Sequence, residues 1–409
     1  MSWSSEGSAG LTVAGLMSGT SMDGVDCAIL DVTPCEEGTE GGEAPLPECR
    51  LAAFRSFPYP QERRDLIRGA LEGGPEDAAV LHARLGEWFA EALLETVRSA
   101  GIPLSRVQVV GSHGQTVWHR PPSGKERGAS LQLGCPATLA ERTSVPVVSD
   151  LRARDLAAGG HGAPLVPWAD RILFSHPDRP RAVQNLGGMA NVTWLPPTTG
   201  EGAHTEIVAF DTGPGVALLD RAAQLATGGR EVCDRDGALA SRGRVDEVLL
   251  ERLLQRPFFQ EVPPRSTGRE AFGDALVQEL SGHLEPGREG EWTDLLATLT
   301  ALTARSVADA YHRWLAPRGV AEVLLTGGGA RNPALVKALE EALYPLPIRT
   351  GAELPLDPDA REAAAFALLA WAHKEGIPAS VPGATGAVGP RILGSLTPAG
   401  GRGATYQGT

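Results

Sequence analysis

The sequence predicts an α/β protein of two domains built on one repeated plan. A pattern of strand, glycine turn and strand opens the chain at residues 11–30, and the same pattern returns at residues 181–195. Amphipathic helical patterns follow each opening, as expected for a duplicated α/β architecture. A chain of 409 residues also exceeds one ordinary core. We therefore place the first domain at residues 1–178, completed by 386–409, and the second at 179–385.

The individual elements follow from periodicity and from turn residues. After the first opening, the polar stretch Thr33–Cys49 is interpreted as a surface loop. The first half then reads, in order, as strand RLAAFRSFPY, helices at 61–72 and 77–100, strands VQVVGS and LQLG, a helix, and strand VPVVSD. The second half reads as a third strand HTEIVAF, helices from Gly215 to Leu315, the strand and glycine turn of AEVLLTGGGARN, and a helix at Pro358–Lys374.

Composition excludes several classes of protein. A formal net charge of -13 argues against a general nucleic-acid binder, which needs a basic surface to replace counterions. The five cysteines contain no CxxC pair, so we expect neither a disulfide framework nor a zinc site. This use of cysteine fits a reducing compartment. The N-terminal sequence has no signal-peptide pattern, and no run of about 18 apolar residues occurs. We expect a cytoplasmic protein without a membrane span.

Four glycine-rich turns follow strands, at residues 18–24, 186–190, 212–215 and 327–329. Glycine lets backbone N–H groups approach an anion closely, so such turns can bind phosphate; the alternative role of each is simply a tight turn. Neither GxxxxGK[ST] nor a GxGxxG that opens a βαβ unit is present. The remaining scheme is two phosphate hairpins facing each other across a cleft, one from each half.

Nine segments in order carry a family resemblance over most of the chain, from Ala14 to about Leu396. They are GLMSGTSMDGVD, GSHGQTVWH, DLRARDLAAGGHGAPLVP, QNLGGMANVT, FDTGPG, DRDGALA, STGRE, TGGGARN and PDAREAAAFALLAW. Together they resemble the anhydro-N-acetylmuramic acid kinases of the actin/sugar-kinase/heat-shock ATPase superfamily. The resemblance implies a duplicated, ribonuclease H-like, actin-like sugar-kinase fold with an interdomain nucleotide cleft, usually in a homodimer. It implies hydrolytic opening of 1,6-anhydro-N-acetylmuramic acid with ATP-dependent phosphorylation of O6, in peptidoglycan recycling.

The resemblance also implies a nucleotide site. The expected ATP-binding residues are Gly19, Thr20, Ser21, Met22, Asp23, Gly24, Val25 and Asp26 in the first hairpin, Gly187 and Gly188 in the second, and Gly327, Gly328 and Gly329 in an adenosine loop. Mg²⁺ takes one or two carboxylates together with water and phosphate oxygens. Asp23 is the expected metal residue, whereas Asp26 has the alternative role of fixing the hairpin.

Two carboxylates are the candidate catalytic residues. Asp211 follows an apolar strand and precedes TGPG, where a base for water activation would be exposed; its alternative role is to cap the next turn. The family's catalytic aspartate falls on this position. Glu362 begins a long apolar helix, where the resemblance places a carboxylate beside the sugar and the alternative is interaction with the helix dipole.

The segment around DLRARD supplies the candidate sugar-binding residues Asp150, Arg152 and Asp155. An arginine can pair with the lactyl carboxylate of the sugar, and the alternative is a salt-bridge cluster. His113 and His161 are given no catalytic role, since a lone histidine more often makes a structural hydrogen bond.

The chain departs from the family pattern at Val216, where an asparagine is expected, and in the long loop after Thr33. Two other functions fit the same motifs. One is an ordinary hexose or N-acetylhexosamine kinase, in which Asp211 deprotonates a sugar hydroxyl. The other is a nucleotide-switched binding protein without sugar chemistry.

Overall fold

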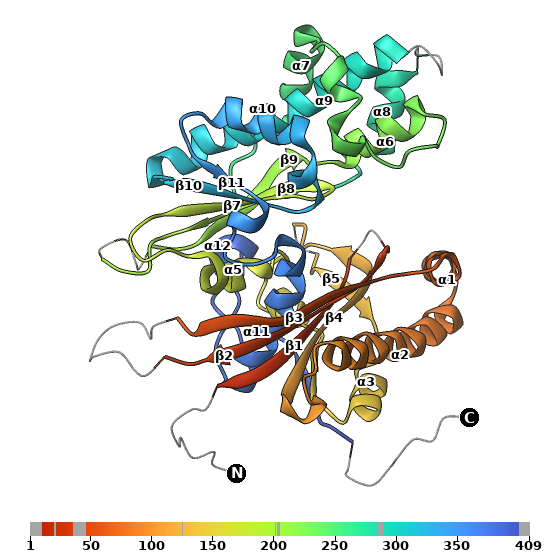
Figure 1. The fold of residues 1–409 in the computed structure, drawn as a ribbon, viewed down its shortest axis with the longest axis vertical. Helices are drawn as coiled ribbons and strands as arrows, with labels where there is room; N and C mark the ends of the chain where they lie inside the picture. The colour runs from red at the N-terminus through yellow and green to blue at the C-terminus, as the bar shows by residue number, and fades with distance from the viewer. Residues whose placement is uncertain are drawn as a thin grey trace. The chain divides into compact units, whose positions relative to one another are not determined.

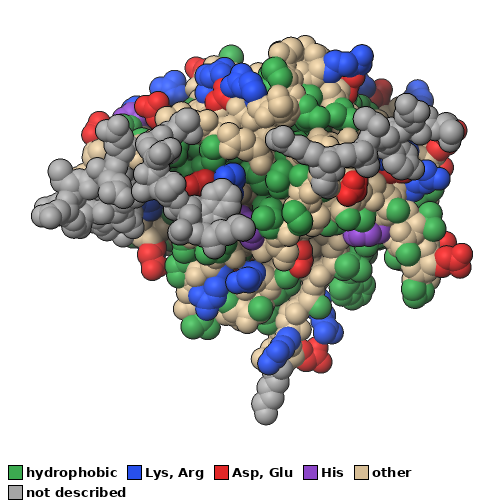
Figure 2. Space-filling model, turned by 90° about the horizontal axis from the view of Figure 1, so that it is seen from below, with side chains coloured by type: hydrophobic (Ala, Val, Ile, Leu, Met, Phe, Trp, Pro, Cys, Tyr) green, Lys and Arg blue, Asp and Glu red, His purple; other side chains and the backbone are tan. Residues whose placement is uncertain are grey.

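The computed structural model describes residues 10–19, 22–35, 46–124, 126–200, 202, 205–282, 284 and 289–400. The chain divides into two compact units, Met1–Leu173 with Ala360–Thr409, and Phe174–Asp359. Among the described residues, no helix is long and apolar enough to cross a membrane. On the face shown in Figure 2, acidic and basic side chains are interspersed.

The first unit contains a mixed seven-stranded sheet (Figure 1). Its strands are β1 (Leu11–Ser18), β2 (Gly24–Thr33), β3 (Glu48–Pro58), β4 (Val107–Arg120), β5 (Ala129–Leu133), β6 (Val147–Ser149) and β12 (Ser395–Thr397). The order is β12-β6-β4-β1-β2-β3, and β5 pairs with β4. The first three strands form an antiparallel meander, β4 runs parallel to β1, and β6 runs parallel to β4.

The second unit repeats this plan in a five-stranded sheet. Its strands are β7 (Arg181–Leu186), β8 (Met189–Leu195), β9 (Val208–Pro214), β10 (Glu322–Thr326) and β11 (Ile348–Arg349), in the order β11-β10-β7-β8-β9. Again the first three strands form an antiparallel meander, the fourth is parallel to the first, and the fifth is parallel to the fourth. The shared order and direction confirm the predicted duplicated, actin-like α/β architecture.

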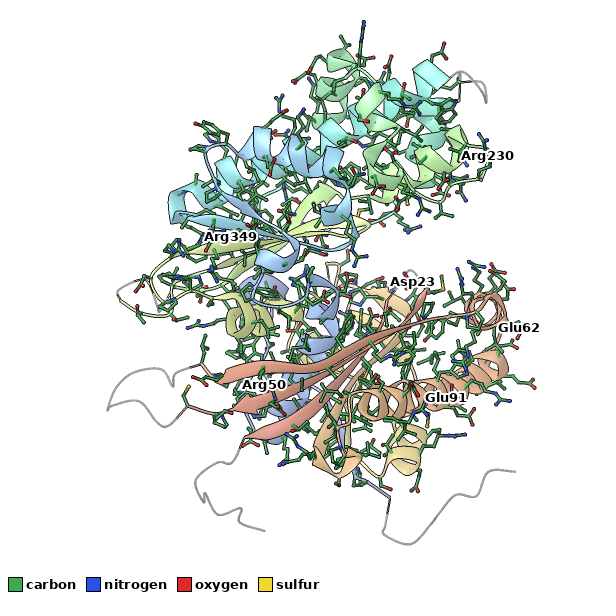
Figure 3. All side chains as sticks on the ribbon, in the orientation of Figure 1. Asp23, Arg50, Glu62, Glu91, Arg230 and Arg349 are labelled. Atoms are coloured by element: carbon green, nitrogen blue, oxygen red, sulfur yellow. The ribbon has the colours of Figure 1, made fainter. Side chains whose placement is uncertain are left out.

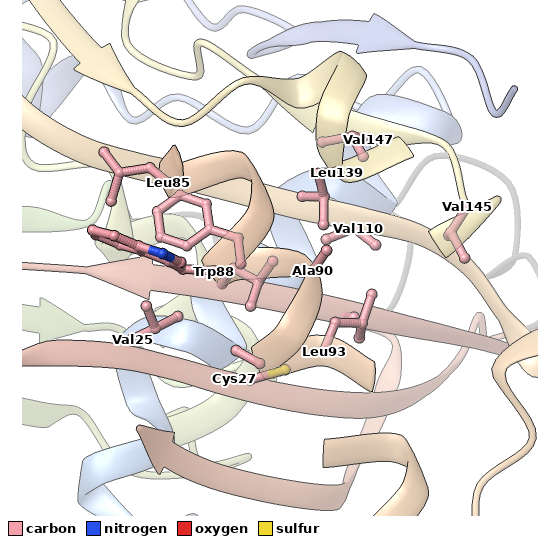
Figure 4. Close-up of a cluster of buried hydrophobic side chains, with 14 of the residues drawn as sticks. Val25, Cys27, Leu85, Trp88, Ala90, Leu93, Val110, Leu139, Val145 and Val147 are labelled. Carbon is pink, nitrogen blue, oxygen red and sulfur yellow. The ribbon is translucent and has the colours of Figure 1, made fainter. Parts of the chain in front are cut away.

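One face of the first sheet is covered by a long amphipathic helix. The helices of this unit are α1 (Gln61–Glu72), α2 (Pro75–Ser99), α3 (Pro136–Thr143), α4 (Ala153–Ala157), α5 (Val166–Phe174), α11 (Arg361–Lys374) and α12 (Pro382–Thr385). Leu85 and Leu93 of α2 pack with Val25 and Cys27 of β2 in the buried cluster shown in Figure 4. Burying such apolar side chains is the main favourable contribution to folding.

The other face of the first sheet is covered by α11 at unusually close range. A Cβ atom on Gly15 of β1 would lie 1.9 Å from the carbonyl oxygen of Ala363, and one on Gly111 of β4 would lie 2.0 Å from that of Phe366. Only glycine leaves room for this approach. Residues 360–385 therefore pack with the first unit, whereas the boundary drawn from the sequence assigned them to the second domain. The boundary drawn from the sequence rested on chain order, which does not reveal this packing.

Helices dominate the second unit between its third and fourth strands, as predicted for residues 215–315. They are α6 (Ala217–Ala226), α7 (Glu247–Leu254), α8 (Asp274–Ser281) and α9 (Glu289–Ala310), and α10 (Pro333–Leu343) follows β10. Val307 of α9 and Leu339 of α10 pack on the sheet beside Phe210. The earlier part of α9 belongs to a second core, in which Phe258 and Phe272 pack with α6, α7 and α8.

The approach of α11 to the sheet makes Gly111 a test of the packing. Gly111→Ala should lower the free energy of unfolding by roughly 1–3 kcal/mol, because the new methyl group overlaps the α11 backbone. Scanning calorimetry measures the change. Gly69→Ala on α1, where nothing lies within 4 Å of a new Cβ, is the matched control and should be neutral or stabilising. Equal melting temperatures for Gly111→Ala and the wild type would contradict this packing.

Candidate active site

The predicted first phosphate hairpin lies between β1 and β2 and carries an exposed aspartate. Asp23 projects from this turn (Figure 3). Its carbonyl oxygen accepts a hydrogen bond from Tyr59 N–H at 2.7 Å, and Met22 has a left-handed backbone with φ of 55°. Gly24 begins β2, and the side chain of Val25 is buried in the core, so Val25 offers only its backbone. The predicted ATP-binding residues Thr20 and Ser21 lie outside the described residues.

Three buried polar side chains hold the start of this hairpin. Ser18 Oγ lies 2.7 Å from Gln115 Oε1 and 3.1 Å from Tyr59 OH. Gln115 Nε2 donates to the carbonyl oxygen of Gly19 at 3.0 Å. Buried polar groups of this kind are costly unless they are hydrogen-bonded, and here each has a partner. Our sequence reasoning assigned no role to Gln115, although it lies in the GSHGQTVWH segment that carries part of the family resemblance.

Two further carboxylates of the first unit act on each other electrostatically. Asp26 lies on β2 and Glu362 in the first turn of α11. Burial raises the pKa of Asp26, and the charges of Asp23 and Glu362 raise it further. Surrounding protein likewise raises the pKa of Glu362, although its side chain reaches solvent, and Arg361 and Arg152 partly oppose that rise. The fold thus brings Arg152 and Glu362, which are far away in the sequence, into electrostatic range of the group formed with Asp23 and Asp26.

The carboxylates of this group fit Mg²⁺ only in part. Within the described part of the chain, no three His, Cys, Asp or Glu side chains are arranged to hold a metal ion. A protein cage for a metal is therefore not formed by these residues. Mg²⁺ bound with ATP needs only one or two carboxylates, because waters and phosphate oxygens supply its other ligands. The exposed carboxylate of Asp23 meets that requirement.

The predicted sugar-binding residues differ in their exposure and in their hydrogen-bond partners within the protein. Arg152 precedes α4, and its guanidinium donates to Gly162 O at 2.7 Å and lies 2.8 Å from His113 Nε2. Asp155 is fully buried, and its carboxylate accepts from Gly162 N–H at 2.8 Å and Thr385 Oγ–H at 2.7 Å. Both carboxylate oxygens of Asp155 therefore accept hydrogen bonds from the protein itself. Asp150 is exposed and has a left-handed backbone, with φ of 52°.

A buried ion pair fixes the start of α11 and thereby the position of Glu362. Arg361 donates from Nε and Nη2 to the two carboxylate oxygens of Asp170 on α5, at 2.8 and 2.5 Å. Both side chains are buried. Such a paired geometry is directional, and loss of one partner would leave a buried charge uncompensated. Sequence reasoning did not find this pair, because the two residues are 191 positions apart.

Asp211 lies in the second unit, inside β9 rather than at its end. The strand continues through Pro214, so Thr212–Pro214 is strand and not the glycine turn expected from the sequence. Thr267 N–H donates to Asp211 Oδ2 at 2.8 Å, and Arg265 donates from Nε to the Asp211 carbonyl oxygen at 3.0 Å. Burial raises the pKa of Asp211 to about 6, with the bond from Thr267 acting in the opposite direction. Thr267 belongs to the STGRE segment, which carried part of the family resemblance but was given no role at the site.

The second hairpin and the predicted adenosine loop pack together in the same unit. The carbonyl oxygen of Gly188 accepts from Gly215 N–H at 3.0 Å, and that of Gly187 accepts from Val216 N–H at 2.8 Å. A Cβ on Gly329 would lie 2.9 Å from Val216 Cγ1. Val216 thus fills space beside the adenosine loop, which is a packing role for the residue that departs from the family pattern. Gly327 begins the loop with φ of 80°, and a Cβ on Gly328 would meet nothing within 4 Å.

Comparison with known proteins places this set of residues in a family. The family model described as anhydro-N-acetylmuramic acid kinase matches residues 11–399, which includes every candidate residue above. The chain belongs to the anhydro-N-acetylmuramic acid kinase family. A family relative from Gloeobacter violaceus is 43% identical over 392 residues, covering 94% of this chain and 98% of the relative. One from Salinibacter ruber is 42% identical over 395 residues, covering 94% and 96%.

Solved structures give weaker matches than these members of the family. An activator of 2-hydroxyisocaproyl-CoA dehydratase from Clostridium difficile has a TM-score of 0.40 at 16% identity, covering 90% of this chain and 96% of that one. A ROK hexokinase from Thermus thermophilus has a TM-score of 0.34 at 17% identity, covering 90% and 100%. Matches with TM-scores this low give no information about the roles of individual residues.

The raised pKa of Asp211 predicts a stability cost that depends on pH. Above pH 6 the folded protein holds an ionised carboxylate where burial disfavours the charge. Below the unfolded pKa of about 4, both states are protonated and the cost disappears. Asp211→Asn should therefore raise the free energy of unfolding by roughly 1–3 kcal/mol more at pH 7.5 than at pH 4.0. Chemical denaturation at both pH values measures this, and an equal effect at the two would refute the raised pKa.

Proposed function

We propose that the chain opens 1,6-anhydro-N-acetylmuramic acid with water and phosphorylates O6 from ATP, giving N-acetylmuramic acid 6-phosphate for cell-wall recycling. The observation that carries this proposal is the state of Asp211. With a pKa of about 6, its carboxylate is mostly ionised at neutral pH and still basic enough to take a proton from water. The bond from Thr267 N–H holds one carboxylate oxygen and leaves the other for water.

Asp211 serves both chemical events in this proposal. It removes a proton from water, whose oxygen forms a bond to C1 of the sugar. The bond between C1 and O6 breaks, and its electron pair stays on O6. O6 then attacks the γ-phosphorus of ATP, and ADP leaves. Glu362, whose pKa is raised by desolvation from the surrounding protein although its side chain reaches solvent, is proposed as the second carboxylate that orients the water or the base.

The phosphoryl transfer depends mainly on positioning and on charge neutralisation. We propose that ATP is bound by residues 19–26 of the first hairpin, by Gly187 and Gly188 of the second, and by the adenosine loop at 327–329. Asp23 would hold Mg²⁺ through its bound water, and the ion would neutralise charge on the phosphates. Arg152 would pair with the carboxylate of the sugar, while Asp150 and Asp155 would support that region.

We further propose a homodimer in the cytoplasm. The homodimer follows from the family resemblance in the motifs. A reducing location agrees with the cysteines, since all five are described and free. These proposals are independent of the chemistry at Asp211.

Removing the base should separate chemistry from binding. Asp211→Asn keeps the size of the side chain but cannot accept a proton at neutral pH. We expect kcat to fall by about 10²- to 10⁴-fold, while calorimetric affinities for ATP and the anhydro sugar change little. Ring opening and phosphorylation should fall together, because one proton removal starts both. A variant with wild-type turnover, or one that opens the ring without phosphorylating it, would rule out this role.

Isotopic labelling distinguishes the proposed reaction from that of an ordinary sugar kinase. In ¹⁸O-water the wild-type product should carry one ¹⁸O at C1, because water supplies the oxygen that replaces the broken bridge. Mass spectrometry of the sugar phosphate, quenched before exchange at C1, measures it. An ordinary hexose kinase introduces no water oxygen, so an unlabelled product would favour that alternative.

The metal assignment is tested at the first hairpin. Asp23→Ala should raise the Mg²⁺ concentration needed for half-maximal turnover by about tenfold or more, because an exposed carboxylate that holds the hydrated ion is lost. The hydrogen bond from Tyr59 involves the Asp23 backbone and remains. Asp65→Ala on α1 removes another exposed carboxylate and is the matched control. Identical Mg²⁺ dependence in the two variants would exclude Asp23.

A further inference from the structure

A buried histidine of the first unit contacts the proposed carboxylate-binding arginine. His113 lies on β4, and 4% of its surface is exposed. Its Nδ1 is 2.8 Å from the carbonyl oxygen of Gly114, and its Nε2 is 2.8 Å from Arg152 Nη2. The ring also lies against Phe366 of α11, with 4.6 Å between ring centroids. The position of the imidazole is therefore set on three sides.

These contacts determine which nitrogen of His113 carries the proton. A carbonyl oxygen only accepts hydrogen bonds, so Nδ1 must be the N–H donor to Gly114. Arginine only donates, so Nε2 must be an unprotonated acceptor for Arg152. A second proton on the ring would face the guanidinium directly. Burial and the charge of Arg152 agree with this, because they lower the pKa of His113 to about 3. His113 is neutral throughout the physiological range.

Arg152 is hydrogen-bonded to uncharged groups and forms no ion pair with a carboxylate of the described residues. Its two hydrogen-bond partners, Gly162 O and His113 Nε2, are both uncharged. Among the ion pairs of the described residues, none includes Arg152, and its Nε is buried without a partner. The carboxylate of Asp155 is occupied by Gly162 N–H and Thr385 Oγ–H. A guanidinium has five N–H donors; Gly162 O and His113 Nε2 use two of them and Nε is buried, so one N–H on each Nη remains for an anion.

We propose that His113 is a positioning residue that selects carboxylate-bearing sugars, by orienting Arg152 without neutralising it. This inference rests on the proposed function, in which the substrate carries a lactyl carboxylate. An aspartate or glutamate at position 113 would orient the guanidinium equally well but would cancel its charge. A neutral imidazole acceptor holds the guanidinium and adds no negative charge to those of Glu362 and Asp155, which already act on Arg152. The preference for an acidic sugar thus depends on a residue that does not touch it.

The test compares the acidic substrate with an uncharged analogue of the same shape. The probes are 1,6-anhydro-N-acetylmuramic acid and its lactyl carboxamide, used with the full chain. His113→Phe removes the acceptor, and His113→Glu keeps an acceptor but adds a negative charge. For both variants, kcat/KM for the acid should fall by about 10- to 100-fold, mainly through KM, because a charge-assisted interaction is lost. The values for the carboxamide should change by less than about threefold, because a hydrogen bond to a neutral amide contributes less than one to a carboxylate.

Two further variants separate positioning from a merely structural role. His113→Gln offers an uncharged side-chain oxygen to Arg152 and should restore most of the preference for the acid. His82→Phe is the matched control in the same unit, because His82 Nδ1 accepts from Gly134 N–H at 3.1 Å and its pKa is shifted by burial rather than by Arg152. It should retain the wild-type ratio of kcat/KM for acid and carboxamide. Equal losses with both substrates in His113→Phe and His113→Glu, or an unchanged ratio, would overturn the inference.

Binding without turnover keeps this inference separate from the proposed reaction. If the wild type phosphorylates neither sugar, the proposed function fails, and calorimetric affinities for the acid and the carboxamide still test the selection. Wild type and His113→Gln should then bind the acid more tightly than the carboxamide, and His113→Glu should not. Circular dichroism melting identifies any variant that does not fold, and the ratio of affinities for acid and carboxamide in the variants that do fold decides the result.

Discussion

The close contact between α11 and the sheet of the first unit is the constraint on which the candidate site depends. Because Gly15 and Gly111 have no Cβ, the helix backbone reaches β1 and β4 directly. This approach brings Glu362, at the start of α11, into electrostatic range of Asp23 and Asp26. It also places Phe366 against His113, so the same contact supports both the acidic group and the arginine site.

Buried partners determine the charge state of each reactive group. Burial moves the pKa of Asp211 up to about 6, close to the working pH of a general base. A neutral imidazole accepts a hydrogen bond from Arg152 and adds no charge beside the guanidinium. The Arg361–Asp170 pair, in contrast, is satisfied within the protein and serves to position α11. Chemically similar side chains thus have different roles because their neighbours differ.

The second unit uses backbone contacts to connect its loops. Carbonyl oxygens of the second hairpin accept hydrogen bonds from the N-terminal end of α6, and Gly329 of the adenosine loop packs against Val216 in the same region. A side chain at Gly215 would collide with Gly187, at 2.0 Å from its carbonyl oxygen. The hairpin, the helix start and the adenosine loop therefore form one packed assembly, and Val216 belongs to it through packing.

The sequence alone determined the longer strands and helices, the duplication and the family, because these depend on local periodicity and on ordered motifs, whereas α5, β11 and β12 were not predicted. The strand order confirmed the duplication, and the family model confirmed the family. Only the tertiary structure decided that residues 360–385 join the first unit, that Asp211 lies inside a strand, and that His113 contacts Arg152. Each of these depends on contacts between residues far apart in the chain, and local patterns contain no information about such distances. The pKa of Asp211 depends on burial and on Thr267, 56 residues away, so it too follows from the fold.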